Sequence, residues 1–357
     1  MKRLAYFLPA ILLAVLGSAQ ELIRNPAKPM NPQAGRVLKL EPVFTISDAS
    51  GGFFFKYPYR FELDDQGYLY ILDEQQLLQF SPEGTFVRNF YRPGQGPGEI
   101  ATGFQMTSFL PLEDGLLVYD GATKIIRFDR EGKLVSEVKQ TAGRFFELIG
   151  IAPNGFFMRS QTDVSWSGAA GFKEIETQVN LVSSDGRSAE KILGFPSRIY
   201  QGPKFGMDWD NYLQVFNRRD GSLYVSRTCE YQVVRADLTE RKIVASFTRE
   251  YPRAPFVISE YEQDFYKKFD PPKKDFANDI VELFLCGDDL WIKTSTSSED
   301  KGKLFDVFDP KGRFLDSFYL GRGLTLRQAG TDFIIVSEKD VDETILVRKY
   351  KIPAGTK

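Results

Sequence analysis

The chain consists of short hydrophobic runs separated by polar turns. In the segment 63–90, a turn that ends at Gly67 is followed by β-branched and aromatic runs of four to seven residues, with a Pro-Glu-Gly turn at 82–84. The segment 112–138 repeats the same order of runs and turns. Runs of this length bounded by turn residues are typical of β-strands. The pattern therefore predicts an all-β chain made of antiparallel hairpins.

This unit recurs along the chain. Six copies can be recognised from the residue that marks the first turn of each, and the mean spacing of these markers is (330 − 67)/5, about 53 residues. Four strands in each of six such units are typical of a six-bladed β-propeller, in which every blade is a four-stranded antiparallel sheet. The markers are Gly67, Gly115, Gly155, Gly221, Asp289 and Gly330.

The two ends of the repeat array complement each other. The sixth unit stops after its third strand at about residue 352, and an unpaired strand pattern, 37–46, precedes the first unit. We expect the N-terminal strand to complete the last blade and so close the ring, which removes the open sheet edges. The sequence thus predicts one propeller domain over 37–352, although 357 residues would by length alone suggest about two domains.

The first 19 residues have the pattern of a targeting segment. Lys2 and Arg3 precede an apolar run, and small residues follow at 17–19. This order is typical of a cleaved signal peptide, and the apolar run is shorter than the roughly 20 residues that a membrane span needs. We expect a signal peptide over 1–19, a linker over 20–36, a C-terminal tail over 353–357, and an exported, periplasmic or secreted product with no membrane span.

Composition narrows the possible functions. The chain has no histidine, which excludes a Ser-His-Asp triad and a histidine-ligated zinc. The 46 basic and 48 acidic residues are balanced, so nothing indicates a nucleic-acid partner. Export would allow a disulfide between Cys229 and Cys286, but we expect two unpaired, partly buried thiols. We also expect a monomer.

The first unit resembles a known repeat. The sequence from Asp65 to Asp73, Gln79–Gly84 and the Gly-Gln-Gly-Pro-Gly-Glu run at 94–99 look like NHL-repeat six-bladed propellers of exported bacterial proteins, within the TolB-like propeller superfamily. The resemblance covers about 37–352 and implies the fold more strongly than a function, because propellers have many unrelated activities.

Enzymes of similar fold suggest one alternative. The amidating-lyase and paraoxonase-like propellers depend on histidines, which this chain lacks. Gluconolactonase-like enzymes place a calcium ion in the central channel on Glu, Asn and Asp side chains. A calcium-dependent lactonase or hydrolase therefore remains an alternative. The sequence spacing of the available acidic and amide residues does not assign them to one site. Those residues include Asp73, Asp120, Asp208, Asp210 and Asn211. The equivalent positions of Asp73 and Asp120 in units one and two favour a structural role in the turn.

Loop lengths differ between the two faces of the predicted ring. Turns between the first and second and between the third and fourth strands are short in nearly every unit. The long segments 161–175, 194–211, 248–279 and 295–303 all fall on the opposite face. Binding residues concentrate in long loops on rigid scaffolds, so this long-loop face is the predicted binding surface.

Aromatic and arginine side chains mark that surface. Trp166, Arg198, Tyr200 and Trp209 suit contact with a peptide or carbohydrate, and the alternative is that each tryptophan only fixes its own loop. Within 248–279, Ser259 and Glu262 form a capping-box pattern that predicts a short helix.

The glycine-rich loop 92–100 is a further candidate. Its backbone amides could bind an anion with help from Arg92, and Gln95 lies in the same loop. The favoured interpretation is a tight return to the ring axis, in which Glu99 anchors the loop through hydrogen bonds.

These observations predict an exported, non-catalytic propeller that binds a protein, peptide or glycan through its long-loop face, without a cofactor. The alternatives are the calcium-dependent hydrolase and an assembly partner in a larger envelope complex.

Overall fold

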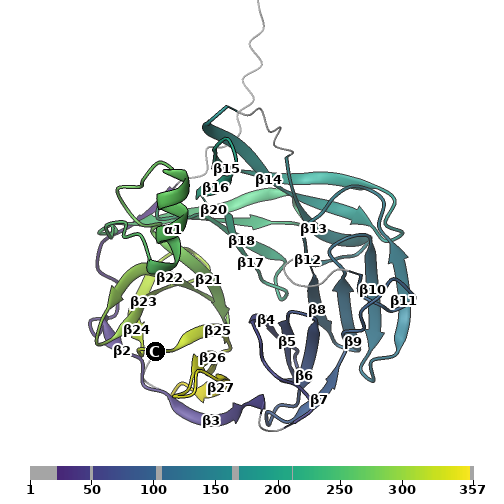
Figure 1. Ribbon diagram of the computed structural model, residues 1–357. Coiled ribbons are helices and arrows are strands. Elements are labelled where there is room, and N and C mark those ends of the chain that lie inside the picture. Colours follow the sequence, from purple (N-terminus) through teal and green to yellow (C-terminus); the bar gives the residue numbers. More distant parts are fainter. Residues whose placement is uncertain (1–21, 49–50, 102–106, 163–168, 211, 354–357) are drawn as a thin grey trace, which may run out of the picture.

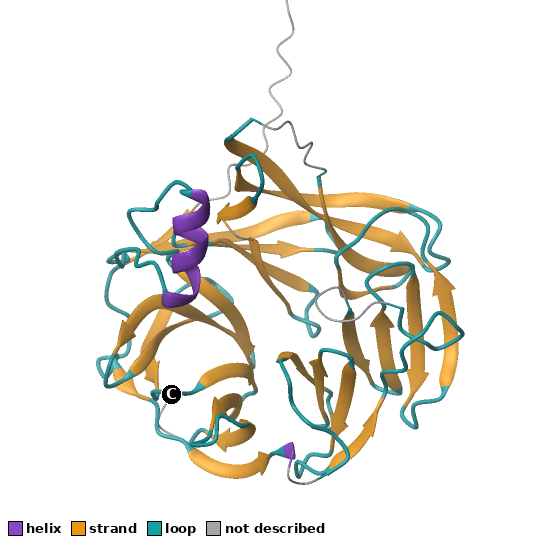
Figure 2. Cartoon of the chain, in the orientation of Figure 1, coloured by secondary structure: helices purple, strands orange, loops and turns teal. Residues whose placement is uncertain are grey.

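The computed structural model describes residues 22–48, 51–101, 107–162, 169–210 and 212–353. The predicted signal peptide and the C-terminal residues 354–357 lie outside these ranges. Within them, six small sheets are arranged in a ring, and the chain is a six-bladed β-propeller, as predicted (Figure 1). Strands dominate the fold, and the main helix sits at the rim (Figure 2).

Blades 1 and 2 are regular four-stranded sheets. Each runs from its innermost strand outward in chain order, and all neighbours are antiparallel. Blade 1 contains β4 (Pro58–Leu63), β5 (Leu69–Asp73), β6 (Gln76–Phe80) and β7 (Phe86–Asn89). Blade 2 contains β8 (Ser108–Leu112), β9 (Gly115–Tyr119), β10 (Lys124–Asp129) and β11 (Leu134–Lys139).

Blade 3 is larger than predicted. Its third and fourth strands have 13 residues each, and a fifth strand folds back along the outer edge. Its strands are β12 (Glu147–Ala152), β13 (Gly155–Gln161), β14 (Gly171–Ser183), β15 (Ala189–Gln201) and β16 (Gly206–Asp210). The expected crossover loop 194–211 is therefore mostly strand, because β15 and β16 pair as a hairpin beyond the body of the blade (Figure 1).

Blades 4 and 5 each have four strands from the repeat. Blade 4 contains β17 (Tyr212–Phe216), β18 (Ser222–Arg227), β19 (Gln232–Asp237) and β20 (Lys242–Arg249). Blade 5 contains β21 (Ile280–Cys286), β22 (Asp289–Ser298), β23 (Gly302–Phe308) and β24 (Phe314–Leu320). The loop expected at 295–303 is shorter than predicted, because β22 and β23 extend into it.

The N-terminal strand closes the ring as predicted. β3 (Glu41–Ile46) pairs antiparallel with β27 (Ile345–Lys351) and completes blade 6 outside β25 (Thr325–Ala329) and β26 (Phe333–Lys339). The strand is shorter than the expected 37–46, because residues 36 and 37 pair with a different blade.

The segment expected to be a linker is also partly strand. β1 (Leu22–Asn25) adds a parallel fifth strand to β20 of blade 4, and β2 (Arg36–Val37) adds one to β24 of blade 5. The chain from 22 to 46 therefore follows the outer edges of three successive blades before the first repeat begins (Figure 1). Backbone pairing over a long sequence separation explains why the local pattern did not reveal it.

The core lies between the blades. Six clusters of buried hydrophobic side chains occupy the described residues, and each joins two neighbouring sheets. The second strands of blades 1 and 2 are buried along their whole length, whereas the outer strands β7 and β11 are half exposed. In the sequence, a strand that is covered on both faces is a continuous run of apolar residues. Trp291 of β22 is buried in this core.

Helix α1 (Glu260–Phe269) forms where the capping pattern predicted it, in the crossover from blade 4 to blade 5. The Ser259 backbone N–H and hydroxyl both donate to the Glu262 carboxylate, at 3.1 and 2.6 Å. The helix ends at Asp270, whose left-handed φ of 41° precedes two prolines. No helix of the described residues is long and apolar enough to cross a membrane.

Candidate functional site

A pocket of about 380 Å³ lies between blades 3 and 4, on the long-loop face. Its walls come from the ends of β13, β14, β15 and β16 and from the start of β17, so the extension of blade 3 creates it. The lining residues are Phe146, Arg159, Ser160, Gln161, Ile175, Thr177, Ser197, Ile199, Asp208, Asp210, Tyr212 and Leu213.

The alternation of the strands explains this lining. In β14 and β15, Ile175, Thr177, Ser197 and Ile199 occupy every second position and share the face toward blade 4. Lower on the same face, Val179 belongs to the apolar core between the two blades. The pocket is thus the upper continuation of a blade interface, where hydroxyl groups replace some of the apolar side chains.

The two carboxylates of the pocket differ in their surroundings. Asp210 is buried, accepts hydrogen bonds from Arg227 Nε at 2.6 Å and from the Cys229 backbone N–H at 3.2 Å, and so supports the wall. Asp208, two residues earlier on the same face of β16, is exposed. A ligand can therefore reach the oxygens of Asp208, whereas Asp210 is engaged within the protein.

Arg159 links the pocket to the central channel. Its Nε lies 3.3 Å from Glu147 Oε2 on the innermost strand of blade 3. Glu147 also accepts hydrogen bonds from Arg60 and from the Gln214 amide, both at 2.8 Å. The Tyr212 hydroxyl donates to Gln214 Oε1 at 2.7 Å. Blades 1, 3 and 4 therefore contribute to one hydrogen-bonded network at the axis.

The charges in this network stabilise one another. Burial raises the pKa of Glu147, but the guanidinium groups of Arg60 and Arg159 outweigh it and hold the pKa below its usual range. Burial raises the pKa of the Tyr212 hydroxyl, so that group stays protonated and donates. The second channel carboxylate, Glu62, lies 3.5 Å from Arg60 and 2.7 Å from Arg218.

These residues do not fit a calcium ion. A calcium site needs six to eight oxygen ligands, several of them carboxylates that can turn toward the metal. Here the channel carboxylates Glu62 and Glu147 bind arginines, and no group of three or more acidic or cysteine side chains in the described ranges could hold a metal. Asn211 lies outside the described residues.

The aspartates of blades 1 and 2 have a structural role in the turns. Asp73 accepts hydrogen bonds from the backbone N–H groups of Lys56 and Tyr57, at 2.8 and 2.6 Å. In blade 2, Oδ1 of Asp120 accepts from three backbone N–H groups at 2.8 to 2.9 Å, those of residues 122–124.

Three of the predicted binding residues come together on the other face of the blade 3 extension. The rings of Tyr200 and Trp209 lie 5.2 and 4.8 Å from that of Phe172, and the Arg198 guanidinium lies 5.1 Å from the same ring. Phe205, at the turn between β15 and β16, continues the cluster toward the helix.

This aromatic cluster fixes helix α1. Phe205 packs against Phe265 and Phe269 with ring centroids 5.3 and 5.1 Å apart. The Lys274 ammonium group donates to the Trp209 carbonyl at 2.5 Å and lies 5.2 Å from its ring. The contacts of Tyr200 and Trp209 thus hold their own segment against the helix, which is the simpler of the two roles considered for them. Trp166 lies outside the described residues.

The glycine-rich loop is a tight turn anchored by Glu99. The Gly96 N–H donates to Glu99 Oε2 at 2.7 Å, and the Lys124 ammonium group donates to the carbonyls of residues 96 and 99. Gly94 has a φ of 148°, and a Cβ there would lie 2.0 Å from the Glu99 carboxylate. Glu99 therefore engages an amide that an anion would need, while Arg92 and Gln95 remain exposed at the surface of the loop.

Cys229 and Cys286 do not form a disulfide, as predicted. Cys286 is buried, and its thiol donates to the Gly330 carbonyl at 2.8 Å. Cys229 is half-buried beside Trp209 and Lys274, and burial raises the pKa of its thiol.

Of the residues that line the pocket, the sequence pointed to Asp208 and Asp210, as possible metal ligands, and did not single out Arg159, Thr177, Ser197 and Tyr212. These four belong to strands, whereas binding residues were expected in long loops. The available signal was the two-residue alternation within 171–183 and 189–201, which places Ile175, Thr177, Ser197 and Ile199 on one face.

Comparison with known proteins supports the fold. The chain is similar to a structure of a Bacteroides fragilis NCTC 9343 protein described as exported, with a TM-score of 0.57, 13% identity, and coverage of 93% of this chain and all of the other. It is also similar to a member of the DUF4221 family from Bacteroides vulgatus ATCC 8482, with a TM-score of 0.54, 12% identity, and coverage of 89% and 99%. No protein-family model matches the sequence, and no curated protein does. At this identity the similarity shows the propeller fold alone.

Proposed function

We propose that this chain is an exported, non-catalytic binding protein that recognises a glycan, peptide or protein through its long-loop face. The observation that carries the proposal is the pocket between blades 3 and 4, built by an extension that the regular blades lack. Pockets formed where elements of a rigid scaffold meet are common ligand sites.

The lining favours a glycan over the other two partners. Ser160, Thr177 and Ser197 supply hydroxyls, Asp208 supplies an exposed carboxylate, and Tyr212 supplies an aromatic ring. Hydroxyl, amide and carboxylate groups can pair with the many hydroxyls of a sugar, and an aromatic ring can pack on its apolar face. A volume of about 380 Å³ suits one or two sugar units, at the small end of ligand pockets.

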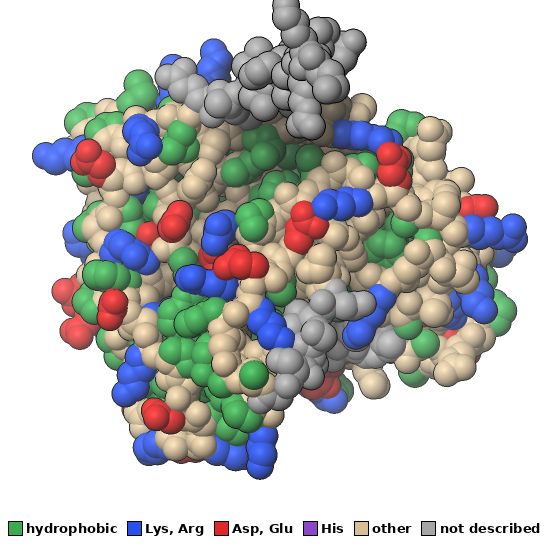
Figure 3. Space-filling view, turned by 90° about the horizontal axis from the view of Figure 1, so that it is seen from above, with side chains coloured by type: hydrophobic (Ala, Val, Ile, Leu, Met, Phe, Trp, Pro, Cys, Tyr) green, Lys and Arg blue, Asp and Glu red, His purple; other side chains and the backbone are tan. Residues whose placement is uncertain are grey.

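The charge of the chain gives no indication of a nucleic-acid partner, because its 46 basic and 48 acidic residues are balanced. Figure 3 shows the rim of the ring, where lysine and arginine side chains are interspersed with aspartate and glutamate and no broad area carries one sign. A nucleic-acid partner would require a basic stripe or patch.

The channel chemistry argues against the hydrolase alternative. Pairing of Glu62 and Glu147 with arginines neutralises the carboxylates that such a mechanism would use as metal ligands or bases. Calcium-dependent lactonase or esterase activity that is lost on chelation would overturn the non-catalytic proposal.

Export is proposed from the signal-peptide pattern over 1–19 and is supported by the similar protein described as exported. N-terminal sequencing of the mature protein from an envelope or medium fraction tests it, and a start near residue 20 is expected. The NHL-type assignment of the blades also stays a prediction, and the role of the chain in a larger complex is tested by co-purification from the envelope.

Glycan and peptide arrays followed by calorimetry test the binding proposal. We expect Asp208→Asn to weaken binding of the selected ligand by roughly tenfold or more, because a hydrogen bond to a charged group is worth about 1.5–3 kcal/mol. Asp65→Asn, at an exposed turn on the opposite face, is the matched control and should leave affinity unchanged. Unchanged affinity in both variants would place the site elsewhere.

A further inference from the structure

The pocket between blades 3 and 4 contains a guanidinium group with unused hydrogen-bond donors. Arg159 of β13 lines the pocket, and its guanidinium lies 5.8 Å from the centre of the Tyr212 ring. Its Nε lies 3.3 Å from Glu147 Oε2 without a hydrogen bond, and its two terminal nitrogens make no hydrogen bond within the part of the chain that the structure describes. The side chain is 30% exposed, so these N–H groups can be reached from the pocket.

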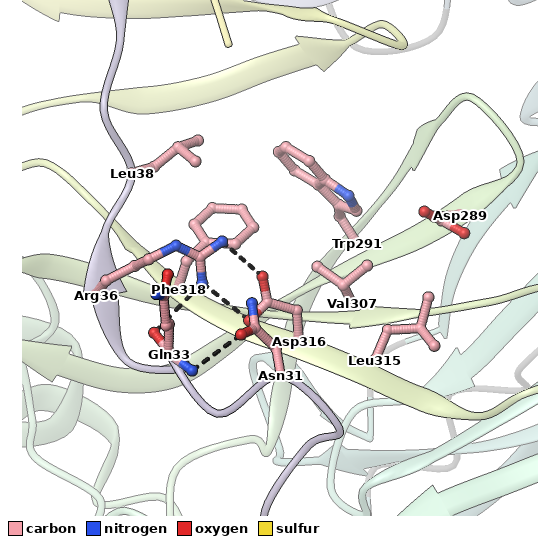
Figure 4. A pocket seen from close by; sticks show the side chains of 10 residues that line it. All are labelled: Asn31, Gln33, Arg36, Leu38, Asp289, Trp291, Val307, Leu315, Asp316 and Phe318. Atoms are coloured by element: carbon pink, nitrogen blue, oxygen red, sulfur yellow. Dashed lines mark hydrogen bonds and ion pairs between the residues drawn. The ribbon is translucent and has the colours of Figure 1, made fainter. Parts of the chain in front are cut away.

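Another cavity shows the opposite arrangement. At blade 5, a cavity of about 320 Å³ is lined by Arg36, whose two terminal nitrogens both donate to the Asp316 carboxylate, at 3.0 and 2.8 Å (Figure 4). The planar fork of that guanidinium is therefore already paired with a carboxylate of the protein itself. Arg159 offers the same fork without such a carboxylate.

The ion pairs around Arg159 leave one positive charge unbalanced. Glu147 is shared between Arg159 and Arg60, whose Nη1 lies 2.8 Å from the Glu147 carboxylate. Arg60 also lies 3.5 Å from Glu62, and Glu62 pairs with Arg218 at 2.7 Å. Three guanidinium groups thus share two carboxylates, and Arg159 is the member of this network that lines the pocket.

The carboxylates of the pocket do not cancel that charge. Asp210 is paired with Arg227 at 2.5 Å. Asp208 is exposed on β16, the third strand from β13 in the same sheet. At about 4.8 Å per strand, the backbones at Arg159 and Asp208 are roughly 14 Å or more apart, beyond the screening length of about 8 Å at physiological ionic strength. The pocket therefore has a cationic inner end and a separate acidic outer end.

We propose that the sugar bound in this pocket is acidic, and that its carboxylate pairs with the terminal nitrogens of Arg159. This inference rests on the glycan-binding function proposed above and specifies the class of sugar. A guanidinium fork matches the two oxygens of a carboxylate, and one unbalanced positive charge suits one carboxylate, as in a hexuronic acid. Hydroxyl groups further along the ligand donate to Asp208 at the outer end.

Calorimetric titration with matched sugars tests the charge. The probes are the methyl glycosides of glucose, galactose and mannose and those of the corresponding uronic acids, in which a carboxylate replaces the hydroxymethyl group. We expect at least one uronide to bind about tenfold or more tightly than its parent hexoside, because the charge-assisted bidentate pair forms only with the acid. Raising sodium chloride from about 50 mM to about 500 mM should reduce this preference and leave hexoside affinity constant.

Arginine substitutions locate the contact. Arg159→Gln keeps N–H donors but removes the charge, and it should make each uronide bind like its parent hexoside. Arg159→Lys keeps the charge without the fork and should retain part of the preference. Arg218→Gln removes the same charge from the same network outside the pocket lining, and as the matched control it should keep the full preference. Thermal melting and circular dichroism establish that the variants are folded.

The possible results separate this inference from the proposed function. Equal affinity for uronides and hexosides, selection of a neutral glycan on the array without binding of any uronide, or a preference that survives in folded Arg159→Gln would each overturn the acidic sugar and leave glycan binding in place. An equal loss of preference in folded Arg218→Gln would also overturn it, because the overall charge of the network and not the contact with Arg159 would select the acid. Absence of binding of all these sugars and of every arrayed glycan to the folded wild-type protein would overturn glycan binding as well.

Discussion

Blades 2 and 3 differ in how the second strand of the sheet passes into the third. In blade 2, the second strand is followed by Asp120, whose carboxylate accepts three backbone N–H groups and closes a short turn. In blade 3, the equivalent position is Ser160, which stays in the ladder between β13 and β14, and the sheet continues through two strands of 13 residues. The pocket lies where the sheet continues, so the point at which the second strand ends separates the regular part of the ring from the elaborated part.

The largest expected effect is the loss of the blade 2 cap. Asp120→Ala leaves three backbone N–H groups in a buried turn without their acceptor, and we expect it to lower the free energy of unfolding by about 3 kcal/mol. Gln161→Ala, at the exposed end of the second strand of blade 3, should change it by less than about 0.5 kcal/mol. Urea denaturation measures both values, and equal losses would contradict the contrast between the blades.

The next largest effect is expected in the central channel. Glu147→Gln removes the negative charge that balances Arg60 and Arg159, and we expect it to lower the free energy of unfolding by about 2 kcal/mol at neutral pH. This is less than for a fully buried pair, because about a fifth of each of the Arg60 and Glu147 side chains is exposed.

The same substitution has a pH signature. The folded-state pKa of Glu147 lies below its ordinary value of 4.5. The contribution of Glu147 to the free energy of unfolding is therefore fully present above about pH 4.5 and declines as the pH falls toward the folded-state pKa. The stability difference between wild type and Glu147→Gln should therefore be constant from pH 8 to pH 5 and shrink in more acidic solution. A difference that grew on acidification would show that the arginines do not lower this pKa. Glu131→Gln, at an exposed turn of blade 2, serves as the control.

A smaller, local effect is expected at the contact between blade 3 and the helix. Phe205→Ala removes the ring that contacts both Phe265 and Phe269. We expect it to lower the free energy of local opening of helix α1 by roughly 1–3 kcal/mol. Hydrogen exchange should quicken in 260–269 and stay unchanged in the strands of blades 1 and 2. Unaltered exchange in the helix would mean that other contacts hold it.

The smallest effect is expected at the helix cap. Ser259→Ala removes the hydroxyl that donates to Glu262, while the backbone N–H donor remains. We therefore expect it to lower the free energy of local opening of helix α1 by about 0.5–1 kcal/mol. Ser259→Thr keeps a hydroxyl and should behave like wild type in hydrogen exchange. An effect of Ser259→Ala as large as that of Phe205→Ala would show that the cap, and not the aromatic contact, determines helix stability.

Local patterns predicted much of this molecule. The turn residues and short apolar runs revealed the repeats that form blades 1 and 2. The missing last strand indicated that the strand predicted over 37–46 closes the ring, and the structure has it at 41–46. The Ser259 and Glu262 pair and the anchoring role of Glu99 were also read correctly, because each depends on partners only three residues apart in the chain.

The candidate sites depended on contacts that local patterns do not contain. Asn25 pairs with Arg249 across more than 200 residues, and Arg36 binds Asp316 across 280. The pocket on the long-loop face needs Thr177, Ser197 and Tyr212 from two blades to meet. By itself the sequence determined the repeat, the ring closure and the absence of histidine chemistry. Only the tertiary structure decided where polar side chains converge, because strand extension and long-range pairing depend on which edges become neighbours when the ring closes.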